Sequence, residues 1–163
     1  MLAYLCGPIE FAGGGESLWR RKLAPFLRDQ LGHRVYDLSE EARRILTPEE
    51  IANFPVWQKT DLERFRRVAR KLIASSLDLI EHRADYVICY WESSGFPGGG
   101  TPAELTAAFR KGIPVYLVTG LPVEEVDVWA LGCSDQVFSS LESLKEFLAN
   151  RFSREKQTQL WKD

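Results

Sequence analysis

The chain has 163 residues, of which 45% are apolar, and its formal net charge at pH 7 is −2. This length and composition predict one domain with a single core, and the weak negative charge disfavours DNA, RNA and anionic lipid, which need a clustered positive field. Three widely spaced cysteines, without a C-x-x-C pattern, indicate neither a disulfide framework nor a zinc site and favour a reducing compartment. The sequence shows no signal peptide and no apolar run of about 20 residues, so we expect a cytoplasmic protein.

Short apolar runs alternate with amphipathic stretches from the start of the chain, a pattern typical of βαβ units. The run 2–6 is almost wholly apolar, as expected for a strand covered on both faces. The expected elements up to residue 59 are, in order, a strand over 2–6, a helix over 18–31 closed by Gly32, a weaker strand over 34–38, a short helix near 40–45 and an irregular loop.

The longest helical pattern begins near residue 60, where Thr60 and Glu63 have the spacing of a capping box. The elements expected from there are a helix over 60–80, buried strands over 86–90 and 115–118, a weaker strand over 136–138 and a final helix over 141–150. The charged segment 151–163 is predicted to be either a last helical turn or mobile.

Five strands with intervening helices predict an α/β protein, a three-layer flavodoxin-like fold with a five-stranded parallel sheet. The domain is expected over 1–150, followed by a C-terminal tail over 151–163. Ligands of such sheets gather at the carboxyl ends of the central strands. This rule selects the loops at 7–15, 91–101 and 119–129.

The second of these loops leads into the segment with the most specific chemistry. Gly98, Gly99 and Gly100 precede Thr101, Pro102 and Glu104 at the expected start of a helix. Glycines let backbone N–H groups approach a ligand, and a helix N-terminus adds partial positive charge. With Thr101 as N-cap, Glu104 is the third helical residue, where the dipole favours an ionised carboxylate able to attack an anomeric carbon. The same Thr-x-x-Glu pattern is also a capping box, and the residues alone leave the two interpretations open.

Three segments of the sequence resemble the nucleoside 2-deoxyribosyltransferase family, including its nucleotide N-hydrolase relatives. They are Tyr4-Leu5-Cys6-Gly7-Pro8-Ile9, the run from Ala84 through Gly100-Thr101-Pro102-Ala103-Glu104-Leu105 to Val115, and Trp129-Ala130-Leu131-Gly132-Cys133-Ser134-Asp135. The resemblance implies cleavage of an N-glycosidic bond by a retaining mechanism with Glu104 as nucleophile, and transfer of the (deoxy)ribosyl group to another base or to water. It also implies a homodimer or higher homo-oligomer with shared active sites that acts on a small nucleoside or nucleotide, and we expect no metal or organic cofactor.

The same resemblance implies roles for individual residues. Tyr4 would hydrogen-bond Glu104, and Asp78 would bind the sugar or help to protonate the base, although a solvated aspartate at a helix end is an equal alternative. The residues expected at the substrate are Gly7, Pro8, Ile9, Glu10, Glu92, Gly98, Gly100, Thr101, Asp127 and Trp129. Of these, Gly98 replaces a family aspartate for which Glu92 would substitute, and Glu10 replaces a basic residue near phosphate, which argues against a 5′-monophosphate.

Two other interpretations stay open. The segment from Pro97 to Glu104 also resembles, one residue short, the P-G-G-x-G-T-x-x-E signature of phosphoribohydrolases that release cytokinin bases from nucleoside 5′-monophosphates. A non-catalytic nucleotide-sensing module would use the same glycine loops without turnover.

Overall fold

The computed structural model describes residues 1–7, 18–92 and 99–160, with side chains described as far as residue 153. Its strands form one parallel five-stranded sheet of order β2-β1-β3-β4-β5. All five expected strands are confirmed to within one residue at their ends: β1 (Leu2–Cys6), β2 (Arg34–Asp37), β3 (Tyr86–Trp91), β4 (Val115–Thr119) and β5 (Gln136–Phe138). The expected flavodoxin-like α/β fold is therefore confirmed.

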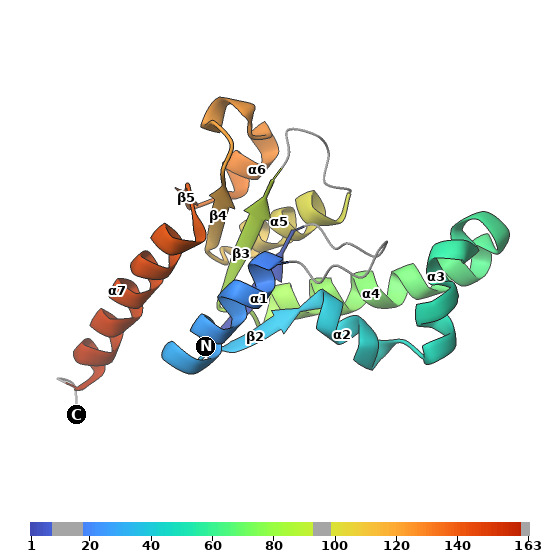
Figure 1. Ribbon diagram of the computed structural model, residues 1–163, viewed down its shortest axis with the longest axis horizontal. Helices are drawn as coiled ribbons and strands as arrows, with labels where there is room; N and C mark the ends of the chain where they lie inside the picture. The colour runs from blue at the N-terminus through green and yellow to red at the C-terminus, as the bar shows by residue number, and fades with distance from the viewer. Residues whose placement is uncertain (8–17, 93–98, 161–163) are drawn as a thin grey trace.

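Helices cover both faces of the sheet and make it the middle of three layers (Figure 1). One face packs against α1 (Leu18–Pro25), the π-helical turn η1 (Phe26–Gln30) and α7 (Leu141–Leu160). The opposite face packs against α4 (Leu62–His82), α5 (Gly100–Lys111) and α6 (Val128–Cys133), the last of which follows the short 3₁₀ turn η2 (Val123–Glu125). Each face has its own cluster of buried side chains, so β1, β3 and β4 are buried on both sides.

The helix expected over 18–31 is present, but its geometry changes in the middle. Pro25 has no backbone N–H to donate, and the chain changes from α-helix to the π turn η1 directly after it. Gly32 ends the element with φ of +70°, the left-handed conformation in which glycine is favoured, as the sequence predicted.

The irregular loop expected up to residue 59 is wrong, because this stretch is mostly helical. After α2 (Leu38–Ile45), the helix α3 runs from Pro48 to Thr60. It starts with a capping box in which Thr47 and Glu50 satisfy each other's backbone N–H groups, and Pro48 occupies an early position where no N–H is required. Pro48 is therefore a helix-start signal in this stretch.

The capping box expected at Thr60 and Glu63 is also wrong. Thr60 is the last residue of α3, and its hydroxyl donates to the carbonyl of Val56. The N-cap of α4 is Asp61, whose carboxylate accepts from the backbone N–H of Arg64 at 3.0 Å. A single aspartate thus ends one helix and starts the next, with no linker between them.

The final helix continues well beyond residue 150. α7 extends to Leu160, and Phe152 is buried in the core cluster on its face of the sheet. Most of the segment 151–163 is therefore helical, and the chain shows no break in structure at residue 150.

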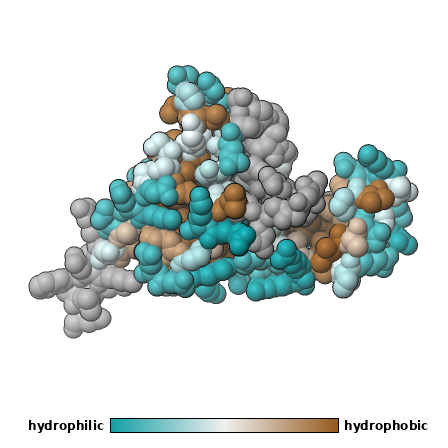
Figure 2. All heavy atoms as spheres, in the orientation of Figure 1, coloured by the Kyte–Doolittle hydropathy of each residue, from teal (hydrophilic) through white to brown (hydrophobic). Residues whose placement is uncertain are grey.

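α2, α3 and the first half of α4 form a lobe beside the sheet, which is the part at the right of Figure 1. This lobe has a small core of its own, made by Ala42, Leu46, Trp57, Val68 and Leu72. Its surface carries apolar side chains among polar ones, as Figure 2 shows at the right of the view, and Ile51, Val56 and Leu62 are exposed there. Within the described ranges, no helix is both long enough and apolar enough to cross a bilayer.

Candidate active site

The candidate site lies where the strand order changes direction, between β1 and β3. The chain leaves β1 toward β2 on one side and later returns to β3 on the other, so the carboxyl ends of these two neighbours face a shared space. Gly7 follows β1, and α5 begins at Gly100 after β3. This switch point is where open α/β sheets bind ligands, and the sequence selected the same loops.

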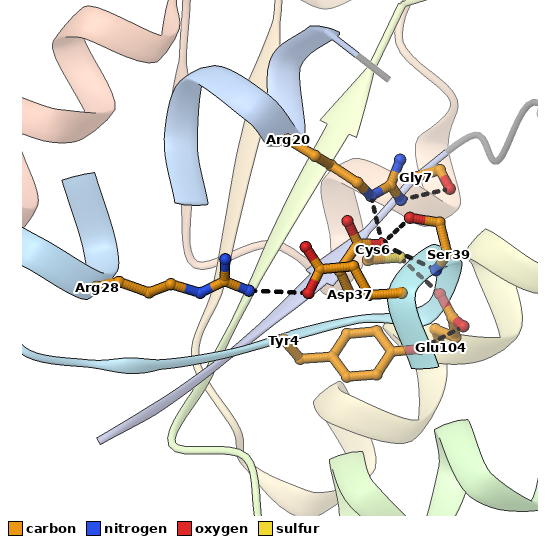
Figure 3. Close-up of polar contacts among 9 residues, drawn as sticks. Tyr4, Cys6, Gly7, Arg20, Arg28, Asp37, Ser39 and Glu104 are labelled. Atoms are coloured by element: carbon orange, nitrogen blue, oxygen red, sulfur yellow. Dashed lines mark hydrogen bonds and ion pairs between the residues drawn. The ribbon is translucent and has the colours of Figure 1, made fainter. Parts of the chain in front are cut away.

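Glu104 on α5 points toward the end of β1 and is held there by two side chains of that strand (Figure 3). The hydroxyl of Tyr4 donates to Glu104 Oε1 at 2.6 Å, and the thiol of Cys6 donates to Glu104 Oε2 at 3.0 Å. The first contact joins residues 100 positions apart in the sequence, and it confirms the expected pairing of Tyr4 with Glu104. Each carboxylate oxygen therefore accepts from a side chain of β1.

The period of a strand explains why Tyr4 and Cys6 act together. Side chains two residues apart point to the same face, and both belong to the buried cluster beneath α4 and α5. The ring of Tyr4 stacks on Tyr36 of β2, with 5.2 Å between ring centroids, and this packing fixes the direction of its hydroxyl. Both donors are thus held by the packed side chains of β1 and its neighbours.

A buried ion pair lies next to this group. Arg20 of α1 places Nε 3.3 Å from Oδ1 of Asp37 at the end of β2, and its Nη2 donates to the carbonyl of Gly7 at 3.1 Å. Asp37 also accepts from the backbone and the hydroxyl of Ser39, which starts α2. Arg20 therefore ties the ends of β1 and β2 to α1.

The start of α5 differs from the sequence-based expectation. Gly99 is the N-cap, without any side-chain cap, and Thr101 is buried inside the first turn. Glu104 is consequently the fifth helical residue, too far along to close a capping box with Thr101, and its contacts are with β1 instead. The capping-box interpretation is therefore wrong.

The electrostatics of Glu104 also differ from expectation. Burial raises the pKa of Glu104 above that of an ordinary glutamate, and the hydrogen bonds from Tyr4 and Cys6 and the charge of Arg20 act in the opposite direction. The helix dipole was expected to keep this carboxylate ionised, but its effect falls off within the first turn, and Glu104 lies beyond it. The protein donors, rather than the dipole, favour the charged form.

Both donors stay protonated at neutral pH. Burial raises the pKa of Tyr4 and of Cys6, and the negative charge of Glu104 raises each further; contact with Cys89 also raises the pKa of Cys6. Ser76 of α4 adds a buried hydroxyl near the same group and lowers the pKa of both Tyr4 and Glu104. The carboxylate thus receives hydrogen bonds from groups that do not themselves ionise.

The glycines around the site have different reasons to be glycine. Gly7 has φ of +141°, and a Cβ added there would lie 2.8 Å from the carbonyl oxygen of Tyr90. Among the described residues, a Cβ added at Gly99 or Gly100 would meet no atom within 4 Å. Gly7 is therefore required by the fold, whereas the described residues do not crowd Gly99 and Gly100 at the start of α5.

Four other expected site residues make contacts with partners other than Glu104. The exposed carboxylate of Asp78 lies 3.3 Å from Nδ1 of His82 on α4, and Glu92 is exposed beside Tyr90. Asp127 is the N-cap of α6, and the Trp129 indole donates to Thr106 of α5 at 2.7 Å. Pro8, Ile9, Glu10 and Gly98 lie outside the described residues.

Several site residues were not identified as such from the sequence. Cys6 could have been found, because it shares a strand face with Tyr4, and Asp37 could have been found at the carboxyl end of the strand next to β1. Arg20 and Ser76 give no such signal, since their place depends on how α1 and α4 pack on the sheet.

Compared with models of known protein families and with curated proteins, the chain matches none.

Proposed function

We propose that the protein cleaves the N-glycosidic bond of a nucleoside or nucleotide, with Glu104 as the nucleophile. The observation that carries this proposal is the carboxylate of Glu104, partly buried at the switch point and hydrogen-bonded through Oε1 to Tyr4 at 2.6 Å. The family that the sequence resembles pairs a tyrosine and a glutamate in this way. A carboxylate serving only to cap its helix would have no need of donors from another strand.

In the proposed first step, an electron pair of Glu104 attacks C1′ of the sugar while the bond from C1′ to the base nitrogen breaks. The base leaves with the electrons of that bond and takes a proton from water. A second nucleophile, either water or another base, then attacks C1′, loses a proton and releases the carboxylate. Two displacements at one carbon retain its configuration, as in glycosidases with a carboxylate nucleophile.

The residues around Glu104 support such a cycle. Tyr4 and Cys6 stabilise the carboxylate that is present before and after the two displacements. No described side chain crowds Gly99 or Gly100, which supports a ligand lying against the backbone amides at the start of α5. The polar groups come from two strands, β1 and β2, and three helices, α1, α4 and α5, which fixes their positions relative to one another.

The test is an assay of base release from a panel of ribo- and 2′-deoxyribonucleosides and their 5′-monophosphates, with and without added adenine. New nucleosides would indicate transfer, and free base alone would indicate hydrolysis. Glu104→Gln should lower turnover by several orders of magnitude and keep the fold. The exposed Glu124→Gln on η2 is the matched control and should leave turnover unchanged. No base release from any member of the panel would overturn the proposal and favour a nucleotide-binding module.

We also propose that the chain forms a homo-oligomer through the surface made by α5 and α6. Phe109, Val128 and Trp129 are 62%, 81% and 56% exposed, and the hydrogen bond from Trp129 to Thr106 joins these two helices. Sedimentation of the wild-type chain and of Val128→Asp tests this, since a charge on this surface should shift the population toward monomer. A wild-type chain that sediments as a monomer would exclude self-association.

A further inference from the structure

The two oxygens of Glu104 are held by donors of unequal strength. Oε1 accepts from the hydroxyl of Tyr4 at 2.6 Å, a distance typical of a strong, charge-assisted hydrogen bond from O–H to a carboxylate. Oε2 accepts from the thiol of Cys6 at 3.0 Å, and a thiol is a weak donor. The Cys6 sulfur also lies 3.9 Å from the carbonyl oxygen of Thr101, so the carboxylate is the closer of these two oxygen acceptors.

We propose that Cys6 is a positioning residue that orients Oε2 of Glu104 as the oxygen that attacks C1′, while Tyr4 anchors Oε1. This inference rests on the proposed function. The strong bond from Tyr4 withdraws charge from Oε1, and the weak bond from Cys6 leaves more of it on Oε2. After attack, Oε2 becomes the ester oxygen bonded to C1′, a poorer acceptor, while Oε1 becomes a carbonyl oxygen that still accepts from Tyr4.

The thiol suits this position better than a hydroxyl or a methyl group would. When Oε2 becomes an ester oxygen, its hydrogen bond from Cys6 is weakened. Losing a weak hydrogen bond from a thiol costs less free energy than losing one from a hydroxyl. Without any donor, Oε2 would be a partly buried carboxylate oxygen with no partner. The thiol is buried in the core and in contact with Cys89, so its direction is fixed by packing.

Substitutions at Cys6 should therefore change the ionisation of Glu104 in opposite directions. Cys6→Ala removes a donor to the charged form, so the pKa of Glu104 should rise by roughly half a unit, the equivalent of one weak hydrogen bond. Cys6→Ser supplies a stronger donor, so this pKa should fall below the wild-type value. A residue needed only for packing would give neither opposed shift.

The experiment measures the pKa of Glu104 directly and through catalysis. The side-chain ¹³C resonance of Glu104, assigned by its absence in Glu104→Gln, is titrated in the wild type, Cys6→Ala, Cys6→Ser and Cys133→Ala. The last variant removes a thiol from the same core cluster without contacting Glu104 and serves as the control. The pH profile of kcat/KM is recorded for the best nucleoside of the panel, and its acid limb should move as the ¹³C pKa does.

The plateau of the pH profile of kcat/KM distinguishes Cys6→Ala from Cys6→Ser. Cys6→Ser should lower the plateau by about twofold, as expected for a half-unit fall in nucleophile pKa at a Brønsted slope near that of thiolates. A 2′-deoxy-2′-fluoro analogue of the same nucleoside is used to trap the glycosyl-enzyme, whose crystal structure should show the ester oxygen beside Cys6 and the carbonyl oxygen beside Tyr4.

Each outcome decides a different point. If the ¹³C pKa of Glu104 in Cys6→Ala equals that in Cys133→Ala, the positioning role of Cys6 is overturned. If the trapped ester oxygen lies beside Tyr4, the assignment of Oε2 is overturned. If the wild type releases no base while the ¹³C shifts are opposed as expected, the coupling of Cys6 to Glu104 stands. The proposed function and the assignment of Oε2 as the attacking oxygen are then both overturned.

Discussion

Arg20 and Asp37 form an ion pair across the ends of α1 and β2, with 3.3 Å between Nε and Oδ1 and with side chains only 4% and 7% exposed (Figure 3). Burial lowers the pKa of Arg20, and the charge of Asp37 acts against this effect. Arg20 in turn lowers the pKa of Glu104. Arg20 therefore places a positive charge near Glu104, and the carboxylate of Asp37 compensates the charge of Arg20.

Replacing Asp37 with Asn should destabilise the protein by about 3–5 kcal/mol, because it removes the negative charge that lies 3.3 Å from the buried guanidinium of Arg20. Asn keeps the side-chain oxygen that accepts from Ser39 at the start of α2, so the cap is preserved and the loss reports the charge. Urea unfolding at pH 7 measures the difference. The exposed pair of Arg28 with Glu40 provides the control, and Glu40→Gln should cost under about 1 kcal/mol. Equal stability of Asp37→Asn and the wild type would contradict the prediction.

Glu104 should make the stability of the fold depend on pH. Burial raises the pKa of Glu104 in the folded protein, whereas the same carboxyl in the unfolded chain titrates at about pH 4.3. Between these two pKa values, the folded chain therefore binds more protons than the unfolded chain. Stability therefore falls as pH rises through this window and stays lowered above it. Glu104→Gln, which carries no charge, should raise the free energy of unfolding at pH 7, and the gain should shrink below about pH 4.

Urea unfolding of the wild type and Glu104→Gln at pH 7 and pH 4 checks this sign. The exposed Glu124→Gln should show no such difference between the two pH values. A Glu104→Gln variant that is less stable than the wild type at pH 7 would mean that the donors around Glu104 outweigh its burial.

Tyr4→Phe should weaken catalysis while leaving the ring in place. The ring still stacks on Tyr36, but Oε1 loses its donor, and a hydrogen bond to a charged group contributes about 1.5–3 kcal/mol. We expect kcat/KM to fall by roughly 10-fold to 100-fold and the acid limb of its pH profile to move to higher pH. Tyr86→Phe is the matched control, because its hydroxyl contacts His33 on the opposite side of the sheet. A Tyr4→Phe variant with the wild-type profile would exclude a role for this bond.

The sequence predicted the sheet well because its strands are buried on both faces. Continuous apolar runs such as 2–6 and 115–118 have no other plausible place than the centre of the layers. The pairing of Tyr4 with Glu104 was expected from the family resemblance, and the sheet order accounts for it, since one lies on the first strand and the other on the helix that follows its neighbour in the sheet.

Local signals failed where two interpretations shared the same residues. Pro48 starts a helix as readily as it marks a loop, and Thr101-x-x-Glu104 looks like a cap although the helix begins before Thr101. Arg20 and Ser76 reach the site only through tertiary packing of their helices, which no spacing in the sequence encodes.

The glycines at the carboxyl edge of the sheet should respond differently to alanine. Gly100→Ala adds a Cβ to the first turn of α5, where it meets no atom of the described residues, so stability should rise by up to about 1 kcal/mol. The same Cβ projects into the space where we place the ligand, so KM should rise. Gly7→Ala should destabilise by more than about 1 kcal/mol, since it combines a positive φ with a 2.8 Å approach to Tyr90.

Gly32→Ala separates the effect of a positive φ from the effect of the close approach to Tyr90, which are combined at Gly7. Gly32 has φ of +70° but no atom within 4 Å of an added Cβ, so its variant carries the backbone penalty alone and should be destabilised less than Gly7→Ala. Thermal unfolding of the three variants and their KM for the best nucleoside of the panel provide the comparison. Gly32→Ala should keep the wild-type KM because it lies away from the site, at the end of η1. An unchanged KM in Gly100→Ala would show that the ligand does not approach the amides at the start of α5, and the attack geometry proposed for Glu104 would then need a ligand on another side of the carboxylate.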